Sequence, residues 1–153
     1  MSGNLEWIGV RAKSGDIQSI DRVIALEGRG LAGDKITLKK SKKRQVTLMQ
    51  KEHISVILSL AQEQDQSKIS NIEYYFKRNL LISKYNIYNL KGKYFRIGEA
   101  RFFGTGDCKP CKKIETLLGK PMLDAMQGMG GITASVITSG EIKINDILHL
   151  EIN

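Results

Sequence analysis

The sequence predicts an α+β fold that is rich in β-structure, with a mainly antiparallel β-barrel core and a few peripheral helices. Segments of strand type outnumber helical ones along the 153 residues, and they do not alternate with helices as in a doubly wound parallel sheet. Only two prolines occur, so regular elements can be long. With 41% apolar and 26% charged residues, the chain can form a sizeable hydrophobic core. We expect a single domain over residues 1–153.

The first half of the chain contains three predicted strands followed by a helix. The turn residue Gly15 and the glycines at 28 and 30 end the first two strands, and a β-branched run forms the third. After it, Ile54, Ile57 and Leu58 recur at helical spacing and place one apolar face toward a core. The sequence therefore predicts strands over residues 7–13, 22–30 and 44–50, and a helix over 51–64.

The second half returns to strands, with short helices between them. Gly98 separates two strands, and Gly119 ends a short helix that follows Cys111. Near the end of the chain, Leu148 and its apolar partners alternate with polar residues such as His149, so one strand face is buried and the other is wet. We predict helices over 71–80, 112–119 and 122–129, and strands over 80–88, 93–105, 131–140 and 141–153.

The chain is basic, with a net charge of +8 and clusters of lysine in residues 38–44 and around the cysteines. A positive surface attracts phosphate groups of nucleic acids, nucleotides or phosphorylated cofactors, although a solvated lysine-rich loop explains the same charges. No run approaches the roughly 18 apolar residues of a membrane span, and the N-terminal residues have no apolar signal-peptide core. We therefore expect a cytoplasmic protein with no membrane partner.

Both cysteines lie in the stretch "GTGDCKPCKKIE", as Cys108 and Cys111. A zinc site would need both of them together with His53 and His149, whose spacing is unlike that of a zinc finger. A dithiol–disulfide couple has the right Cys-x-x-Cys form, but that motif belongs beside a βαβ pattern near the chain start. Both interpretations therefore lack part of their usual context.

Two further interpretations treat the cysteines separately. One of them can be a nucleophilic or metal-binding thiolate, since Lys109, Lys112 and Lys113 favour the charged form of the sulfur. Alternatively, the cysteines are small buried hydrophobes in a strand-to-helix turn. Because they lie in a loop of glycine, lysine and proline, we expect both Cys108 and Cys111 to be poorly buried.

Several segments together resemble MOSC domains, which are homologous to the C-terminal part of molybdenum cofactor sulfurases. The resemblance extends over residues 6–152, and it depends on the order and spacing of the segments. These segments are "GLAGD" (30–34), "RQVTLMQKEH" (44–53), "FKRNLLIS" (76–83), "KGKYFRIGEARFFGTGDCKPCKKIETLLG" (91–119) and "AMQGMGGITASVITSGEIKINDIL" (125–148).

The resemblance implies a fold like the β-barrel domain of pyruvate kinase and a pterin-bound molybdenum cofactor, which can be absent from the isolated protein. The essential cysteine of the family corresponds to Cys111, which would bind molybdenum or carry a persulfide. Arg44 and Asn79 occupy matching positions and are expected to bind the cofactor, as is Lys112 beside the cysteine. Cys108 is expected to be an auxiliary residue.

The resemblance leads to three hypotheses about function. The first is a stand-alone MOSC protein that binds the cofactor's molybdenum or carries sulfur. The second is a molybdenum-dependent reductase of N-hydroxylated compounds, although residues 39–45 retain only Arg44 of the His-Gly-Gly-x-x-Arg stretch found in some relatives. The third is a non-enzymatic module for cofactor assembly. The chain has no room for a pyridoxal phosphate domain, so we expect a separate sulfur donor such as a cysteine desulfurase, or an electron donor protein, together with cofactor biosynthesis proteins. Nucleic acid is not an expected partner.

Overall fold

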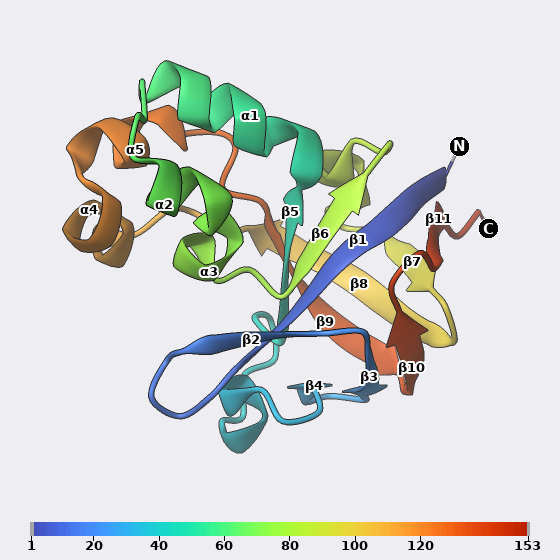
Figure 1. Cartoon of the computed structure of the whole chain (residues 1–153). Helices are drawn as coiled ribbons and strands as arrows, with labels where there is room; N and C mark the ends of the chain where they lie inside the picture. Colours follow the sequence, from blue (N-terminus) through green and yellow to red (C-terminus); the bar gives the residue numbers. More distant parts are fainter. Residues whose placement is uncertain (1, 153) are drawn as a thin grey trace.

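The computed structural model describes residues 2–152, and its centre is a closed β-barrel (Figure 1). The strands follow each other in the order β1-β6-β5-β9-β8-β7-β11, and β11 pairs back onto β1. Every neighbouring pair is antiparallel except β5 and β6. The predicted fold class is therefore confirmed. The barrel strands are β1 (Ser2–Arg11), β5 (Val46–Gln50), β6 (Leu80–Ser83), β7 (Tyr94–Ile97), β8 (Ala100–Asp107), β9 (Ile132–Thr138) and β11 (Ile147–Leu150).

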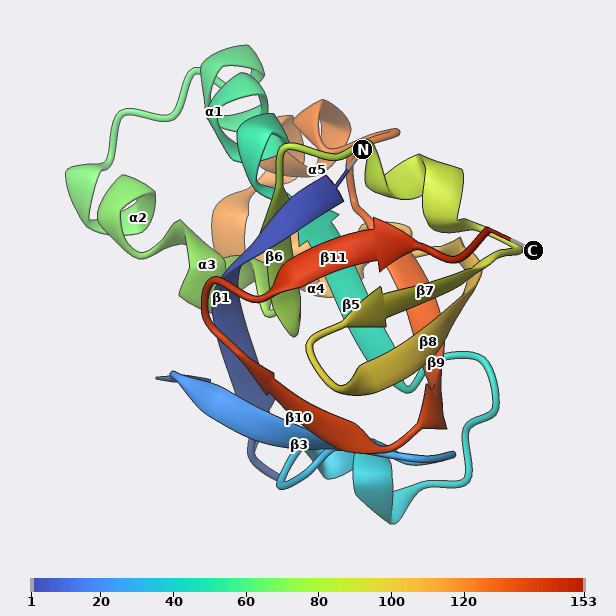
Figure 2. The same cartoon turned by 90° about the vertical axis from the view of Figure 1, so that its right-hand side faces the viewer.

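Shorter strands extend the barrel wall and cover one of its ends. Strand β2 (Ile17–Ile20) pairs with β1 outside the closed ring. A second sheet of β10 (Gly140–Lys143), β3 (Arg22–Leu26) and β4 (Gly30–Leu31) lies across one end of the barrel (Figure 2). Apolar residues of this sheet belong to the same core as the barrel interior, so the sheet closes that end.

The α-helices form a layer on one side of the barrel (Figure 1). They connect β5 to the parallel strand β6, and β8 to β9. A parallel pair needs such a crossover, because a tight hairpin can only join antiparallel strands. The helices are α1 (Lys51–Leu60), α2 (Gln66–Ser70), α3 (Ile72–Phe76), α4 (Lys112–Leu118) and α5 (Lys120–Ala125), with 3-10 turns η1 (Lys35–Leu38) and η2 (Ile87–Leu90).

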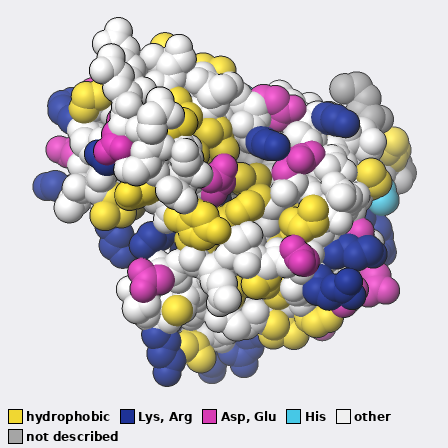
Figure 3. Space-filling model, in the orientation of Figure 1, with side chains coloured by type: hydrophobic (Ala, Val, Ile, Leu, Met, Phe, Trp, Pro, Cys, Tyr) yellow, Lys and Arg dark blue, Asp and Glu magenta, His cyan; other side chains and the backbone are white. Residues whose placement is uncertain are grey.

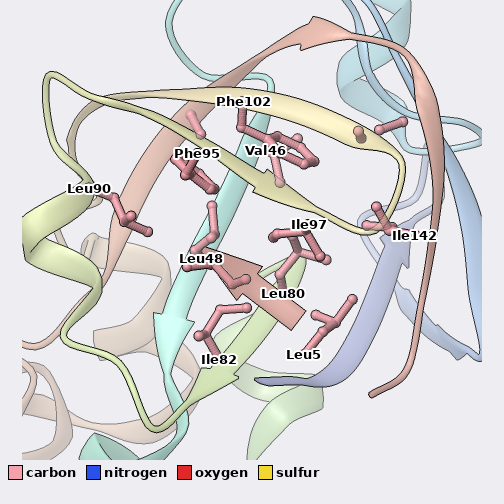
Figure 4. Close-up of a cluster of buried hydrophobic side chains, with 14 of the residues drawn as sticks. Leu5, Val46, Leu48, Leu80, Ile82, Leu90, Phe95, Ile97, Phe102 and Ile142 are labelled. Atoms are coloured by element: carbon pink, nitrogen blue, oxygen red, sulfur yellow. The ribbon is translucent and has the colours of Figure 1, made fainter. Parts of the chain in front are cut away.

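Two hydrophobic cores hold these layers together, and strand β5 contributes to both. Val46 and Leu48 point into the barrel, where they pack with the apolar side chains shown in Figure 4. Met49 points to the other face and packs with helix residues such as Ile57 and Phe76. Because side chains alternate along a strand, a continuous apolar run is what a strand buried on both faces requires.

Several predicted element bounds need correction. The helix predicted over 71–80 ends at Phe76, because Lys77 takes a left-handed backbone conformation with φ of 56°. The helix predicted over 51–64 ends at Leu60, and the strand predicted over 80–88 ends at Ser83. None of the helices within residues 2–152 combines the length and the apolar character needed to cross a membrane.

Candidate functional site

A cleft of about 280 Å³ lies between helices α3 and α4 and the turn that joins β1 to β2. Figure 3 shows Lys and Arg side chains gathered at the hollow on this side of the molecule. No acidic side chain lines the cleft within the described part of the chain. We call it the cationic cleft, and its basic lining residues are Arg11, Lys35, Arg44, Lys77, Arg78 and Lys113.

The barrel topology brings the three arginines to one place. Arg44 precedes β5 and Arg78 precedes β6, and these two strands are parallel, so both arginines lie at the same end of the barrel. Arg11 is the last residue of β1, which runs antiparallel to β6 and pairs Ile8 with Leu80. Three distant segments therefore deliver positive charge to one cleft.

Cys111 lines the same cleft and is exposed. It immediately precedes α4 in an extended backbone conformation, and its carbonyl oxygen accepts a hydrogen bond from the amide of Ile114 at 2.9 Å. Lys113 lines the cleft with it, whereas Lys112 does not; Lys112 lies at an adjoining depression that shares Lys113 and Leu117 with the cleft. The structure thus brings Cys111 and Arg44 together and places Lys112 outside their cleft.

Arg78 is the basic residue of the cleft that lies deepest, with only 7% of its surface exposed. Its Nε donates to the carbonyl oxygen of Gly130 at 2.8 Å, and its Nη1 donates to that of Phe76 at 2.9 Å. Its Nη2 is buried and has no hydrogen-bond partner among residues 2–152. A buried donor without a partner is costly, so an anion that reaches it would be bound favourably.

The pKa shifts of the basic residues around the cleft also favour an anionic ligand. Burial lowers the pKa of the Arg78 guanidinium; negative charge on Cys108 or Cys111 would raise it, and the charge of Arg44 lowers it. Burial also lowers the pKa of Lys35, and the charges of Arg11 and of its other basic neighbours lower it further. Asp34 is a counter-charge for Arg11 and Lys35, but the crowded cations as a whole favour an anionic ligand.

A buried polar network holds Arg11 in place. The Oδ1 of Asp34 accepts from Nη2 of Arg11 at 3.1 Å and from the amide of Ile36 at 2.9 Å. Its Oδ2 accepts from the amide and Nε of Arg11, and from Nδ2 of Asn79 at 2.8 Å. Burial by itself raises the pKa of Asp34, but these hydrogen bonds and the Arg11 charge outweigh it, and the pKa lies below its ordinary value. Asp34 therefore stays charged, and it holds Arg11 in position at the cleft.

Asn79 belongs to this network and is completely buried. Its Oδ1 accepts from the amide of Thr47 at 3.0 Å, and its Nδ2 also donates to the carbonyl oxygen of Gly9 at 3.0 Å. It is not among the residues that line the cleft. The segment "FKRNLLIS" thus contributes Arg78 to the cleft, whereas the sequence led us to expect Asn79 there.

Cys108 has a different environment from Cys111. Only 1% of its surface is exposed, so the expectation that both cysteines are poorly buried is wrong for this one. Its amide donates to the carbonyl oxygen of Gly131 at 2.9 Å. Gly130 packs so closely that a Cβ atom there would clash with the carbonyl oxygen of Cys108. The segment with Gly130 and Gly131, which comes later in the chain, therefore encloses Cys108. The sequence of the cysteine loop alone could not predict this burial.

Cys108 lines a second cleft of about 390 Å³. One wall is made of backbone from the glycine segment, where the amide of Gly131 donates to the hydroxyl of Tyr88 at 3.0 Å. The cleft also contains the ion pair between Lys91 and Asp107, at 2.9 Å. We call it the glycine cleft, and its lining residues are Tyr88, Lys91, Asp107, Cys108, Lys109, Pro110, Gln127, Gly128, Gly130 and Gly131.

Within residues 2–152, no group of three or more His, Cys, Asp or Glu side chains is arranged to hold a metal ion. His53 packs against Tyr88 and His149 is exposed on β11, so neither lines a cleft with a cysteine. A metal in the cationic cleft would therefore take a single protein ligand, the thiolate of Cys111, and its other ligands would come with it. The surrounding cations would neutralise the negative groups of such a complex.

Comparisons with known proteins agree with this fold. The family model of the MOSC domain matches residues 33–149. The YuaD protein from Bacillus subtilis superposes with a TM-score of 0.79 at 16% identity, covering 97% of this chain and 94% of that one. YiiM from Escherichia coli gives a TM-score of 0.69 at 23% identity, over 98% of this chain and 70% of that one. No curated protein sequence matches the chain. At these identities the solved structures show a shared fold.

Proposed function

The chain belongs to the MOSC domain family, and from this premise we propose that it acts in molybdenum cofactor metabolism, with Cys111 binding the cofactor's molybdenum or carrying sulfur to it. The family is linked to molybdenum cofactor binding and to sulfurase-like roles. The observation that carries the proposal is that an exposed cysteine shares one cleft with six basic side chains.

The residues of the cleft suit such a cofactor. A pterin cofactor with a phosphate group needs cationic donors, and Arg11, Lys35 and Arg44 supply them. The unpaired Nη2 of Arg78 offers a further donor on a residue that lines the cleft with Cys111. When bound, the cofactor would supply molybdenum for redox or sulfur chemistry, and a thiolate is a suitable ligand for such a soft metal.

The remaining predicted residues receive different roles in this proposal. Arg44 would contact the anionic part of the ligand directly. Asn79 would act through Asp34 and Arg11, because it holds the carboxylate that fixes this arginine. Lys112 would contribute only a long-range charge, since it lies outside the cleft. As a carrier, the protein would receive sulfur from a donor and deliver it during cofactor assembly.

The experiment compares the two cysteines in protein made by a host that produces the cofactor. We expect molybdenum and pterin fluorescence to copurify with the wild type, or persulfide to be found on it, and Cys111→Ser to lose whichever is present. Cys108→Ala is the matched control and should keep it. Equal molybdenum, pterin and persulfide contents in wild type and Cys111→Ser would contradict the proposal. Turnover of N-hydroxylated compounds with a reduced electron donor would instead support the reductase hypothesis.

A further inference from the structure

We propose that the cationic cleft binds a small anionic sulfane-sulfur donor of the thiosulfate class, and that Cys111 takes the sulfur directly from it. The inference rests on the proposed function in one respect, since Cys111 must be able to carry sulfur. It goes beyond that function because it names the donor as a small dianion and not as a protein.

The first reason is that one cleft combines a nucleophile with positive charge. Cys111 is exposed in it, and the six basic residues have no acidic partner among the lining residues of the described chain. Asp34, the ion-pair partner of Arg11, is not among the lining residues, and Arg11 donates to both of its oxygens. Such a cleft concentrates small anions at the thiol.

The second reason is the deep position of Arg78. Its Nε and Nη1 are occupied by backbone carbonyl oxygens, whereas its buried Nη2 has no partner among residues 2–152. Arg78 and Cys111 line the same cleft, so the guanidinium is on the side of the molecule where the sulfur would react. A guanidinium at this place can bind a sulfonate oxygen and stabilise the charge that develops on the departing group.

The third reason is that the ligand must engage both the thiol of Cys111 and the basic side chains of the cleft. A phosphate ester would satisfy the cations but offer no electrophile to Cys111. A neutral polysulfide would offer an electrophilic sulfur but gain nothing from six positive charges. A thiosulfate-class anion carries the electrophilic sulfur and the negative oxygens in one small molecule, which a volume of about 280 Å³ accommodates.

The reaction balances without an external oxidant or reductant. The Cys111 thiolate attacks the outer sulfur of the donor, and a new sulfur–sulfur bond forms at Cys111. The sulfur–sulfur bond of the donor breaks, and its electron pair leaves with sulfite. Thiolate and thiosulfate thus become a Cys111 persulfide anion and sulfite, with the same total charge on both sides.

The test uses the full chain and thiosulfate as the probe. Sulfite release is followed with time, and the mass gain of one sulfur atom is assigned to a cysteine by peptide mass spectrometry. We expect wild type and Cys108→Ala to react and Cys111→Ser to be inactive. The rate with thiosulfate should fall steeply as salt is added, whereas the rate with dimethyl trisulfide, a neutral donor, should not.

Charge variants separate cleft binding from simple thiol reactivity. Arg78→Met should lower the thiosulfate rate about ten- to hundredfold, and Arg78→Lys should restore part of it. Lys113→Met provides an exposed variant that does not depend on a buried site, and it should lower the rate about threefold. Lys93→Met, outside the cleft and exposed, is the matched control and should leave the rate unchanged.

Two results would overturn the inference. One is a wild-type protein whose Cys111 is alkylated readily but gains no sulfur from thiosulfate. The other is a thiosulfate rate that responds neither to salt nor to Lys113→Met. If a cysteine desulfurase with cysteine still loads Cys111 in that protein, the proposed function survives and only the small-anion donor is excluded. If no donor loads it and no molybdenum binds, the proposed function fails as well.

Discussion

The two clefts at the loop of residues 108–111 differ in what lines them and in what they can bind. The cationic cleft at Cys111 is lined by six basic side chains and, within the described chain, by no acidic one, although Arg11 is paired with Asp34 outside the lining. The glycine cleft at Cys108 is lined in part by three glycines, and its Lys91 is already paired with Asp107. The hydrogen bond from Arg78 to Gly130 joins a residue of one cleft to a residue of the other. Two cysteines of one short motif thus have different surroundings, since Cys111 is exposed in one cleft and Cys108 is buried against the other.

Alkylation of the native protein tests most directly whether Cys111 and Cys108 differ in accessibility. We expect iodoacetamide to modify Cys111 at least about a thousandfold faster than Cys108, because a residue that is 1% exposed reacts only through rare local opening. Peptide mass spectrometry after timed quenching measures both rates, and denatured protein serves as the control in which both react. Comparable native rates at the two cysteines would contradict their different burial.

Substitution of a glycine in the wall of the glycine cleft is expected to have the next largest effect, a loss of stability. Gly131→Ala should cost about 3 kcal/mol or more of unfolding free energy, because φ is +100° and a Cβ atom would clash with the carbonyl oxygen of Leu48. Gly128→Ala is the matched control, since its φ is also positive but its Cβ would meet open space, and it should cost about 1 kcal/mol. Urea denaturation measures both. A smaller loss in Gly131→Ala than in Gly128→Ala would show that this wall is not rigid.

Asp34 and Asp107, the carboxylates near the two clefts, should differ in how much they contribute to the free energy of unfolding. Asp34→Asn should lower the free energy of unfolding at neutral pH by about 1–3 kcal/mol, because Arg11 loses its charged partner. Asp107→Asn, whose pair with Lys91 is half exposed, should change it by less than about 1 kcal/mol.

The pH dependence of Asp34 gives a second measurement. Its pKa is lowered in the folded protein, so its contribution is complete above its ordinary value of 3.8 and is lost as the pH falls through the folded value. Asp34→Asn should therefore lose less stability on acidification below that pH than the wild type does, as measured by urea denaturation at a series of pH values. Parallel curves for the two proteins would contradict this role.

The smallest expected effect distinguishes two neighbouring lysines. Lys113→Met should raise the sulfate concentration that halves the alkylation rate of Cys111 by about two- to threefold, because this lysine lines the cleft. Lys112→Met should change that concentration less, since Lys112 is not among the lining residues of the cleft. Equal effects of both substitutions would return Lys112 to the cofactor-binding role that the sequence predicted.

Local patterns predicted much of the fold. The spacing of Ile54 and Ile57 indicated α1, and the β-branched run before it indicated β5. The end of α3 could not be predicted, because Lys77 takes a left-handed conformation that is uncommon for a residue other than glycine, and its amide caps the helix by donating to the carbonyl oxygen of Glu73. That single residue decides where Arg78 and Asn79 lie.

The site was predicted only in part, for a similar reason. The motif resemblance pointed to Cys111 and Arg44, and the structure brings these two together. Arg78 could not be predicted as a cleft residue, because its position depends on burial and on a hydrogen bond to the carbonyl oxygen of Gly130, fifty-two positions later. Arg11 joins the cleft only through the pairing of β1 with β6. Charge can be counted along a sequence, but which charges converge is decided by the barrel topology.

The closure of the barrel between β1 and β11 has a consequence for when the protein can work. Residues 2–4 pair with residues 147–149, so the ring closes only when its last strand has been synthesised. Contacts so distant along the chain slow folding, because a long loop must be ordered before they form. Arg11 reaches its place at the far end of that same first strand. The cleft is therefore expected to become competent only after strand β11 has been synthesised and paired with β1.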